Sequence, residues 1–264
     1  MAKLFLTNSQ APIHAAFVRE LAEYLGARTP TTIEIVTTGM WAEREARFEA
    51  GEIALGWICG APYVEKMARH LPLRLLAAPV MAHPRYKNRP IYFSDVIVRA
   101  ESEFLTFDDL RGARWVYNEP NSHSGYHTVR HYLAVHDLTR EFFGDVRASG
   151  AHETSVLMIL RDEADASAID SSVLEMLFAA TPALREQLRV IESIGPSPMP
   201  PLVTSVRMSL GMFIQLETAL TAMHNNPDGL AILQRAQMAR FVKVSDADYN
   251  AIREMLARAS AIEL

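Results

Sequence analysis

The sequence predicts an α/β protein built from two lobes, and three observations support this prediction. Short β-type runs alternate with helix-length amphipathic segments along most of the chain, which is typical of β-α-β units. The alternation restarts after Ala100, and four prolines within 195–201 interrupt regular structure. At 264 residues, the chain is longer than most single domains. The expected limits are 1–99 with 201–264 for lobe 1, 100–200 for lobe 2, and connecting strands near 92–100 and 195–205.

The first hundred residues alternate strands and helices. An apolar residue recurs at every fourth position from Ile13 to Leu25, which predicts the inner face of a helix. The nearly uncharged run between Gly51 and Gly60 is typical of a strand buried on both faces. The expected strands are 3–7, 32–37, 53–59, 73–80 and 92–99, and a further helix is expected at 62–69. Strands separated by helix-sized segments predict parallel pairs with right-handed crossovers.

The second half of the chain repeats this pattern. The expected strands are 115–118, 145–149, 164–169 and 188–194, and the expected helices are 124–135, 154–161 and 173–179. Beyond the proline-rich segment, apolar residues from Phe213 to Met223 follow helical spacing. Ser245 and Asp248 have the spacing of a capping box, so they predict the start of the last helix.

Composition excludes several classes of protein. With 49% apolar and 22% charged residues the chain has the composition of a globular protein, not of a disordered one. A net charge of −5 argues against a general binder of nucleic acid or anionic membrane. The single cysteine, Cys59, allows neither an internal disulfide nor a cysteine-rich zinc site. Only three apolar residues, Leu4–Leu6, follow the start, too few for a signal peptide. The expected location is therefore cytoplasmic, or periplasmic if a signal has been removed.

The most informative local feature is Trp115–Gly125 (WVYNEPNSHSG), where a predicted strand leads directly into a helix start. A helix start presents free N–H groups and a partial positive charge, and small hydroxyl residues add donors. Ser122, His123 and Ser124 are therefore candidates to hold a tetrahedral oxyanion, with Gly125 allowing the ligand to approach the backbone. The alternative is that Ser122 or Ser124 only caps the helix.

Segment 110–126 (LRGARWVYNEPNSHSGY) resembles the central motif of the phosphate/phosphite/phosphonate-binding proteins of ABC importers. Further landmarks follow in family order: SGAHETS at 149–155, ADASAID at 164–170, NPDG at 226–229 and FVKVSDADY at 241–249. The resemblance spans nearly the whole chain and implies a type 2 periplasmic-binding-protein fold, with the ligand in a cleft between two α/β lobes. It implies a solute-binding protein for phosphate, phosphite or an alkylphosphonate, with an ABC permease or a sensor protein as partner.

Carried over by position, the resemblance places six residues around the ligand. Ser122, His123 and Ser124 hold the oxyanion, and His123 replaces the common threonine, which would add a cationic donor. His152 matches a histidine that also reaches the oxyanion. Two aromatic residues match ligand contacts of the first lobe, namely Tyr92 and Trp41. Each residue also has a structural alternative, because His152 neighbours a predicted helix start and the two aromatics are typical of a core.

The sequence differs from the family pattern at the two positions that bind the amine of an aminoalkylphosphonate ligand. Aminoalkylphosphonate binders of this family use two carboxylates there, and this chain has Ser172 and Pro200. A buried ammonium without a carboxylate partner is strongly disfavoured, so an amine-bearing ligand is not expected. Two points stay open. Asp170 is close enough in sequence to replace the missing carboxylates in part. Ser172 has an alternative role in a helix cap, with Glu175 three residues further on.

No cofactor or metal is expected. His123, His127 and His131 share a helix face at a legitimate metal spacing, but Ser124 stands where a zinc protease motif has glutamate. A solvated or cleft-edge face is therefore the expectation for these histidines. The phosphate-loop, dinucleotide-binding and Gly-x-Ser-x-Gly motifs do not occur in the sequence.

Two other functions compete with the binding protein. Cytosolic enzymes of menaquinone- and thiamine-precursor synthesis use the same two-lobed fold, and His152 or His123 would then serve as a general base. A ligand sensor that signals to a cytosolic partner is the third alternative. The fold alone does not decide among them, but the Ser-His-Ser-Gly landmark favours a non-catalytic binder.

Overall fold

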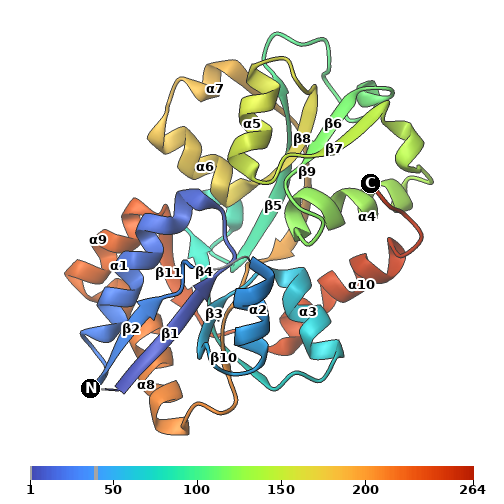
Figure 1. Cartoon of the computed structure of the whole chain (residues 1–264). Helices are drawn as coiled ribbons and strands as arrows, with labels where there is room; N and C mark the ends of the chain where they lie inside the picture. The colour runs from blue at the N-terminus through green and yellow to red at the C-terminus, as the bar shows by residue number, and fades with distance from the viewer. Residues whose placement is uncertain (1, 39–40) are drawn as a thin grey trace. The chain divides into compact units, whose positions relative to one another are not determined.

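The computed structural model describes residues 2–38 and 41–264, without the side chains of residues 2, 41 and 42. These residues form two compact units (Figure 1). Unit 1 comprises Met1–Gln10, His14–Ile91 and Pro198–Asn250, and unit 2 comprises Ala11–Ile13, Tyr92–Ser197 and Ala251–Leu264. Each unit has its own sheet, so each is described by itself below.

The two units differ from the expected lobe limits at two segments. Strand β5 (Ile91–Arg99) was expected in lobe 1, but it pairs with β8 (Ala166–Asp170) in the sheet of unit 2. The segment 251–264 was also expected in lobe 1, but it belongs to unit 2, where Arg130 binds its main chain. Both assignments depend on long-range contacts that local sequence patterns do not contain.

Six strands form the sheet of unit 1, in the order β11 (Met238–Val242), β4 (Leu73–Met81), β10 (Leu202–Ser205), β3 (Leu55–Trp57), β1 (Ala2–Asn8) and β2 (Thr31–Ile35). β1 pairs in parallel with β2 and β3, as predicted. β10 and β11 run antiparallel to their neighbours, so the predicted parallel pairing does not extend to these two strands. β10 enters the sheet after an extended strand, without a crossover helix that would impose parallel geometry.

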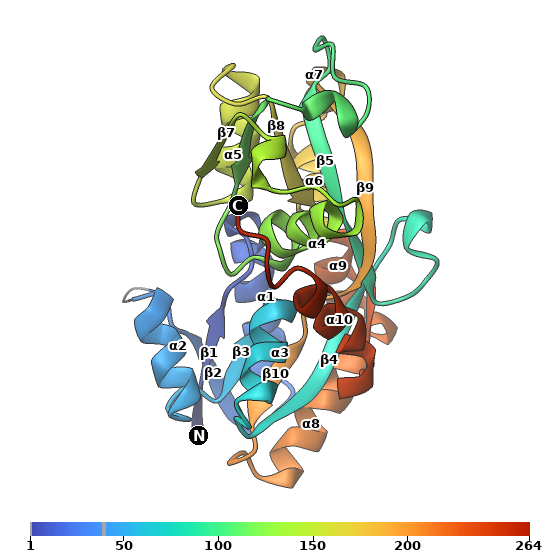
Figure 2. The same cartoon turned by 90° about the vertical axis from the view of Figure 1, so that its right-hand side faces the viewer.

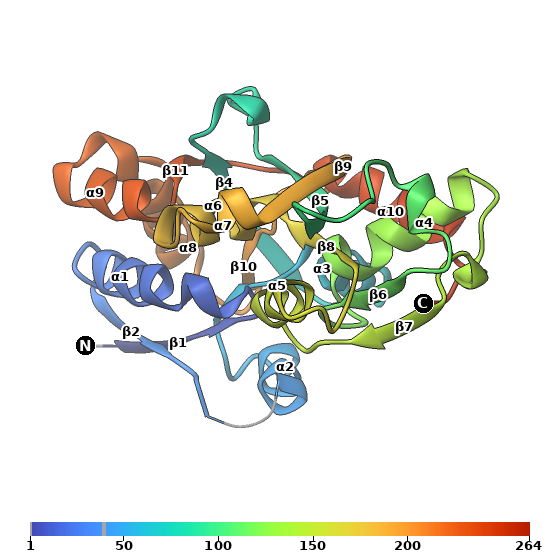
Figure 3. The ribbon, with the colours of Figure 1, turned by 90° about the horizontal axis from the view of Figure 1, so that it is seen from above.

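The helices of unit 1 are α1 (Ala15–Gly26), α2 (Trp41–Glu49), α3 (Gly60–Ala68), α8 (Leu210–Thr221) and α9 (Pro227–Arg235). α1 and α2 lie on opposite sides of β1 (Figure 3). The polar helix α2 is held by the buried Lys66 of α3, which forms ion pairs with Glu45 and Glu49. Trp57 of β3 is buried against the ring of Phe17, and its indole N–H donates to the Pro200 carbonyl.

Five strands form the sheet of unit 2, in the order β7 (Asp145–Ala148), β6 (Arg114–Tyr117), β8, β5 and β9 (Leu188–Pro198). β7, β6 and β8 are mutually parallel, whereas β5 is antiparallel to β8. β9 was expected to end before the proline-rich segment, yet it continues to Pro198. An edge strand tolerates proline because its outward N–H groups have no ladder partner.

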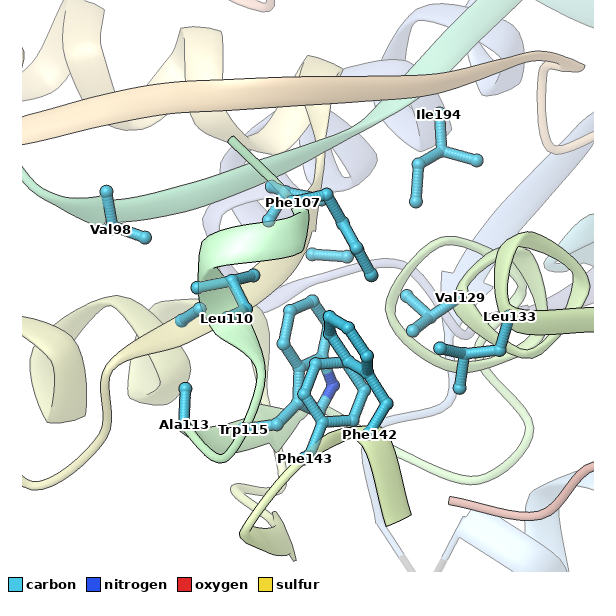
Figure 4. Close-up of a cluster of buried hydrophobic side chains, with 13 residues drawn as sticks. Val98, Phe107, Leu110, Ala113, Trp115, Val129, Leu133, Phe142, Phe143 and Ile194 are labelled. Atoms are coloured by element: carbon cyan, nitrogen blue, oxygen red, sulfur yellow. The ribbon is translucent and has the colours of Figure 1, made fainter. Parts of the chain in front are cut away.

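Helices cover both faces of this second sheet. On one face, Trp115 of β6 and Val96 and Val98 of β5 pack with Val129 and Leu133 of α4 (Thr128–Val135), a cluster drawn in part in Figure 4. On the other face, the alternate strand residues pack against α5 (His152–Leu160) and α6 (Ser171–Ala180). This alternation follows the two-residue period of a strand. Because helices bury both faces, these strands appear as continuous apolar runs in the sequence.

The remaining elements are short, apart from α10. α7 covers Leu184–Gln187, and α10 covers Asn250–Arg258. Helical turns occur at Pro12–His14, Pro84–Tyr86, Asp108–Leu110, His123–His127, Arg140–Phe142, Met223–Asn225 and Asp246–Tyr249. Within the described residues, no helix has the length and apolar character needed to cross a bilayer.

Candidate ligand-binding site

The candidate site lies in unit 2, at the sheet edge where the three parallel strands end. β6 leads to the helical turn that starts at His123, β7 leads to α5, and β8 leads directly to α6. Because the strands are parallel, these three helix starts follow the same edge of the sheet. Ligands of open α/β sheets bind beyond the carboxyl ends of the strands. Helix N-termini there offer free N–H donors and a partial positive charge to an anion.

The turn after β6 is a π-helix over His123–His127, a rare form that often occurs at functional sites. It is closed by hydrogen bonds from the His127 N–H to the Ser122 carbonyl (3.1 Å) and from the Thr128 N–H to the His123 carbonyl. The sequence predicted an ordinary helix starting at Ser124. We call this turn, residues 122–127, the binding turn.

The structure brings three of the predicted site residues into one hydrogen-bonded chain. The Ser124 hydroxyl lies 3.0 Å from Nε2 of His152 and 3.3 Å from the Ser122 hydroxyl. Ser122 is also the N-cap of the binding turn, since its Oγ accepts from the Gly125 N–H at 3.1 Å. Ser122 therefore caps the binding turn, and its contact with the ligand stays a prediction. All three side chains are buried, with 3–7% of their surfaces exposed.

A neighbouring threonine, which sequence reasoning missed, fixes the backbone of Ser124. The Thr128 hydroxyl donates to the Ser124 carbonyl at 2.6 Å and lies 2.9 Å from the Ser94 hydroxyl on β5. Thr128 and Ser94 are fully buried, and their contact anchors the binding turn to strand β5. Thr128 does follow Ser124 by one helical repeat, but the sequence contains no signal for its contact with Ser94.

Gly125 is required for close packing within the site. A Cβ atom at this position would lie 2.0 Å from Oδ1 of Asn118 and 3.3 Å from Cε1 of His152. The sequence predicted that Gly125 makes room for the ligand, whereas the close neighbour here is Asn118, at the end of β6. Asn118 Oδ1 is buried and has no hydrogen-bond partner among the described residues. Asn118 is therefore a site residue that the sequence did not indicate.

His123 does not have the role expected from the sequence. Its ring is fully buried, its Nε2 lies 3.0 Å from the Ser197 hydroxyl, and Tyr92 packs edge-on at 6.4 Å between ring centroids. Burial, with smaller contributions from His127 and His131, lowers the pKa of His123 to about 3. The imidazole is neutral at physiological pH, so the expectation of a cationic donor at this position is corrected.

Tyr92 lies beside the binding turn and belongs to unit 2, not to the first lobe as expected. Its side chain is buried, with 1% of its surface exposed. Its contact with His123 supports the core-aromatic alternative. The neighbouring Phe93 N–H donates to the Ser171 hydroxyl at the start of α6, which links β5 to the third helix start.

Asp170 and Ser172 form the cap of α6. Oδ1 of Asp170 accepts from the Ser172 N–H at 2.8 Å and from the Ser172 hydroxyl at 2.6 Å. Ser172 therefore does take part in a helix cap, but the capping residue is Asp170 and not Ser172 itself. Burial raises the pKa of Asp170 to about 6, although the hydrogen bonds from α6 act in the opposite direction.

The other predicted contacts belong to unit 1. Trp41 is the first residue of α2, and its side chain lies outside the described residues. Pro200, at the second amine-reading position, is buried and offers only its carbonyl, which accepts from the Trp57 indole N–H at 3.1 Å.

The three histidines of the shared face do not form a metal site. His123 and His127 are buried, which corrects the expectation of a solvated or cleft-edge face. Burial, with the charge of Arg130, lowers the pKa of His127 to about 4. Across residues 2–38 and 41–264, no group of three or more His, Cys, Asp or Glu side chains is arranged to hold a metal ion.

Comparison with known proteins identifies the family. Residues 5–249 match the family model described as the periplasmic substrate-binding protein of phosphonate ABC transporters. The chain belongs to this family. It is accordingly a solute-binding protein of the ABC-transporter type and not an enzyme, as the Ser-His-Ser-Gly landmark predicted.

Solved structures share the fold of this phosphonate-family binding protein. A binding protein component of an ABC phosphonate transporter from Pseudomonas aeruginosa is similar with a TM-score of 0.84 and 17% identity, over 98% of this chain and 87% of that one. PhnD1 from Prochlorococcus marinus, in complex with methylphosphonate, has a TM-score of 0.84 and 16% identity over 98% and 99%. A Xanthomonas citri protein bound to ATP has a TM-score of 0.76 and 14% identity over 98% of both chains. These likenesses confirm the predicted periplasmic-binding-protein fold.

Proposed function

We propose that the binding turn holds the oxyanion of phosphate, phosphite or a small alkylphosphonate. The observation that carries this proposal is the hydrogen-bonded chain Ser122–Ser124–His152 at a helix start. A tetrahedral oxyanion offers several acceptor oxygens, and hydroxyl and imidazole N–H groups are donors that suit it. The methylphosphonate bound by the Prochlorococcus marinus protein is a ligand of this size and charge.

The charge of the anion is balanced without a basic side chain from the binding turn. His123 and His127 are neutral at physiological pH, because burial lowers the pKa of each. The N-termini of the binding turn, α5 and α6 supply partial positive charge at this edge of the sheet. Such a site resembles those in which backbone N–H groups and hydroxyls bind a phosphoryl group.

The ligand is expected to lack an ammonium group. Ser172 and Pro200 occupy the amine-reading positions, and neither supplies a carboxylate. Asp170 is engaged with the N–H and hydroxyl of Ser172, and its pKa of about 6 shows that its charge is poorly stabilised where it lies. These contacts strengthen the argument against an aminoalkylphosphonate.

The partner and location follow from the same family membership. We infer that the protein delivers its ligand to the permease of an ABC importer. The family description places such proteins in the periplasm, which favours the periplasmic alternative over the cytoplasmic location expected from the start of the sequence.

A thermal-shift panel tests the ligand class. Methylphosphonate, phosphite and phosphate should raise the melting temperature more than 2-aminoethylphosphonate, which must bury its ammonium without a partner. A ligand at 100 times its Kd stabilises the folded protein by about 2.7 kcal/mol, enough for a clear shift. Sulfate and benzoate at equal concentration are the controls for charge and for an aromatic carboxylate. A largest shift with 2-aminoethylphosphonate would contradict the amine argument, and a shift with benzoate alone would contradict the oxyanion proposal.

A further inference from the structure

The last residues of the described chain are connected to the binding turn by hydrogen bonds. After α10 the chain forms a short turn, closed by a hydrogen bond from the Ile262 N–H to the Ala259 carbonyl at 3.0 Å. Ile262 and Leu264 then pack against the hydrophobic cluster that contains Val129 and Leu133 of α4. In Figures 1 and 2 this red segment runs beside α4. We call residues 259–264 the C-terminal strap.

Arg130 joins the strap to the binding turn. Its guanidinium donates through Nη2 to the Ala259 carbonyl at 2.8 Å and through Nε to the Ile262 carbonyl. Its Nη1 donates to Nδ1 of His127, the last residue of the binding turn, at 3.0 Å. One planar group with fixed donor directions thus bridges two backbone acceptors of the strap and one side chain of the turn.

Tyr126 provides a second connection. Its ring lies under the Arg130 guanidinium at 5.3 Å, and its hydroxyl accepts from the Leu264 N–H at 3.4 Å. The same ring packs on Tyr117 of β6, with ring centroids 4.9 Å apart. Two of the five residues of the π-helix, Tyr126 and His127, are therefore fixed by contacts with Arg130 and the strap.

A π-helical turn is a rare form, and the contacts of Tyr126 and His127 hold this one in place. If the turn relaxed to α-helical pairing, the Ser124 hydroxyl would change direction relative to His152. None of the strap contacts given above reaches Ser122, Ser124 or His152. Its influence on these residues passes through Arg130 and the backbone of the turn.

We propose that Arg130 is a positioning residue for ligand binding and that the C-terminal strap sets the geometry of the binding turn. This inference rests on the proposed function, because it names the support of the same site. It predicts that affinity for the oxyanion depends on residues of the strap although the strap does not contact the site residues.

Titration calorimetry with methylphosphonate, on the full chain and its variants, tests the proposal. Arg130→Ala, and separately a chain ending at Arg258, should weaken binding about tenfold or more, the scale of one misdirected hydrogen bond to a charged ligand. Arg130→Lys keeps the charge but cannot reach three acceptors together, so its affinity should fall between those of Arg130→Ala and the wild type.

Arg189→Ala is the matched control. Arg189 also lies in unit 2 and also binds main-chain carbonyls, those of Ala100, Ser102 and Phe104, but it does not hold the binding turn. This variant should lose thermal stability and keep the wild-type Kd within about twofold. If both arginine variants reduce affinity equally, the effect is one of general stability and the proposal is wrong.

Hydrogen exchange gives a readout that needs no ligand. In the ligand-free protein, Arg130→Ala should speed exchange of the amides of residues 123–128, and Arg189→Ala should not. Unchanged exchange and unchanged affinity in a folded Arg130→Ala protein would overturn the proposal, even if the truncated chain fails to fold. If the wild type binds no phosphorus oxyanion, the proposed function fails, whereas the exchange experiment still decides the role of the strap.

Discussion

Replacing Gly125 with alanine is expected to weaken oxyanion binding by about 10- to 150-fold, the effect of losing one hydrogen bond to a charged ligand. The added Cβ would lie 2.0 Å from Oδ1 of Asn118, so either Asn118 or the binding turn must move. Overpacking of this kind also costs about 1–3 kcal/mol of folding free energy. Calorimetry with methylphosphonate and thermal unfolding measure the two effects.

Two further variants separate crowding from a general effect of the substitution. Gly211→Ala, in α8, meets no atom within 4 Å and should stabilise the protein by up to about 1 kcal/mol without changing affinity. Asn118→Ala combined with Gly125→Ala removes the colliding carboxamide and should recover part of the lost affinity. A Gly125→Ala protein that binds and melts like the wild type would contradict the packing of Asn118 described here.

The second large effect is a loss of stability in mild acid. The pKa values of His123 and His127 fall from 6.5 to about 3 and about 4, mainly through burial. The unfolded chain therefore binds more protons than the folded one below pH 6.5, and the free energy of unfolding decreases as the pH falls. At pH 5 each histidine should lower it by about 2 kcal/mol relative to pH 8.

Asp170 acts in the opposite direction. Its raised pKa of about 6 means that the folded state takes up a proton first, which offsets the loss by about 1 kcal/mol at pH 5. Urea unfolding from pH 8 to pH 5 should show the net decrease. His123→Gln with His127→Asn keeps polar partners for Ser197 and Arg130 and should flatten the profile, whereas His136→Gln, at an exposed position, should not. A wild-type profile that stays flat over this range would contradict the neutral, buried state of the two histidines.

Local sequence patterns predicted the elements that carry strong periodicity. α1 and the parallel strands β6, β7 and β8 lie within a few residues of their expected positions. α2 was not predicted, because its few apolar residues give little periodicity, and the buried Lys66 that anchors it comes from another helix. β11 was missed because a short antiparallel strand is defined by its partner and not by its own pattern.

The residues of the candidate site were also predicted from the sequence only in part. Ser122, Ser124 and His152 were named from the sequence, and the structure brings them together. The neutral state of His123 could not be predicted, because burial and not residue type sets its pKa. Asn118 lies next to Gly125 because of the fold of the binding turn. Arg130 contacts the C-terminal strap, which is more than a hundred residues away in sequence. No local spacing encodes such contacts. The ligand role of Trp41 stays a prediction.

Titration of methylphosphonate into Ser124→Ala, compared with the wild type, tests the central claim most directly. Loss of one hydrogen bond to a charged ligand should weaken binding by about 10- to 150-fold, equivalent to about 1.5–3 kcal/mol. Ser102→Ala is the matched control, because the hydroxyl of this serine donates to the Arg99 carbonyl in a loop of the same unit, and its loss should leave Kd unchanged. A Ser124→Ala protein that stays folded and binds at least tenfold more weakly is the result we predict. Wild-type affinity in that variant would contradict the assignment of the oxyanion to the binding turn.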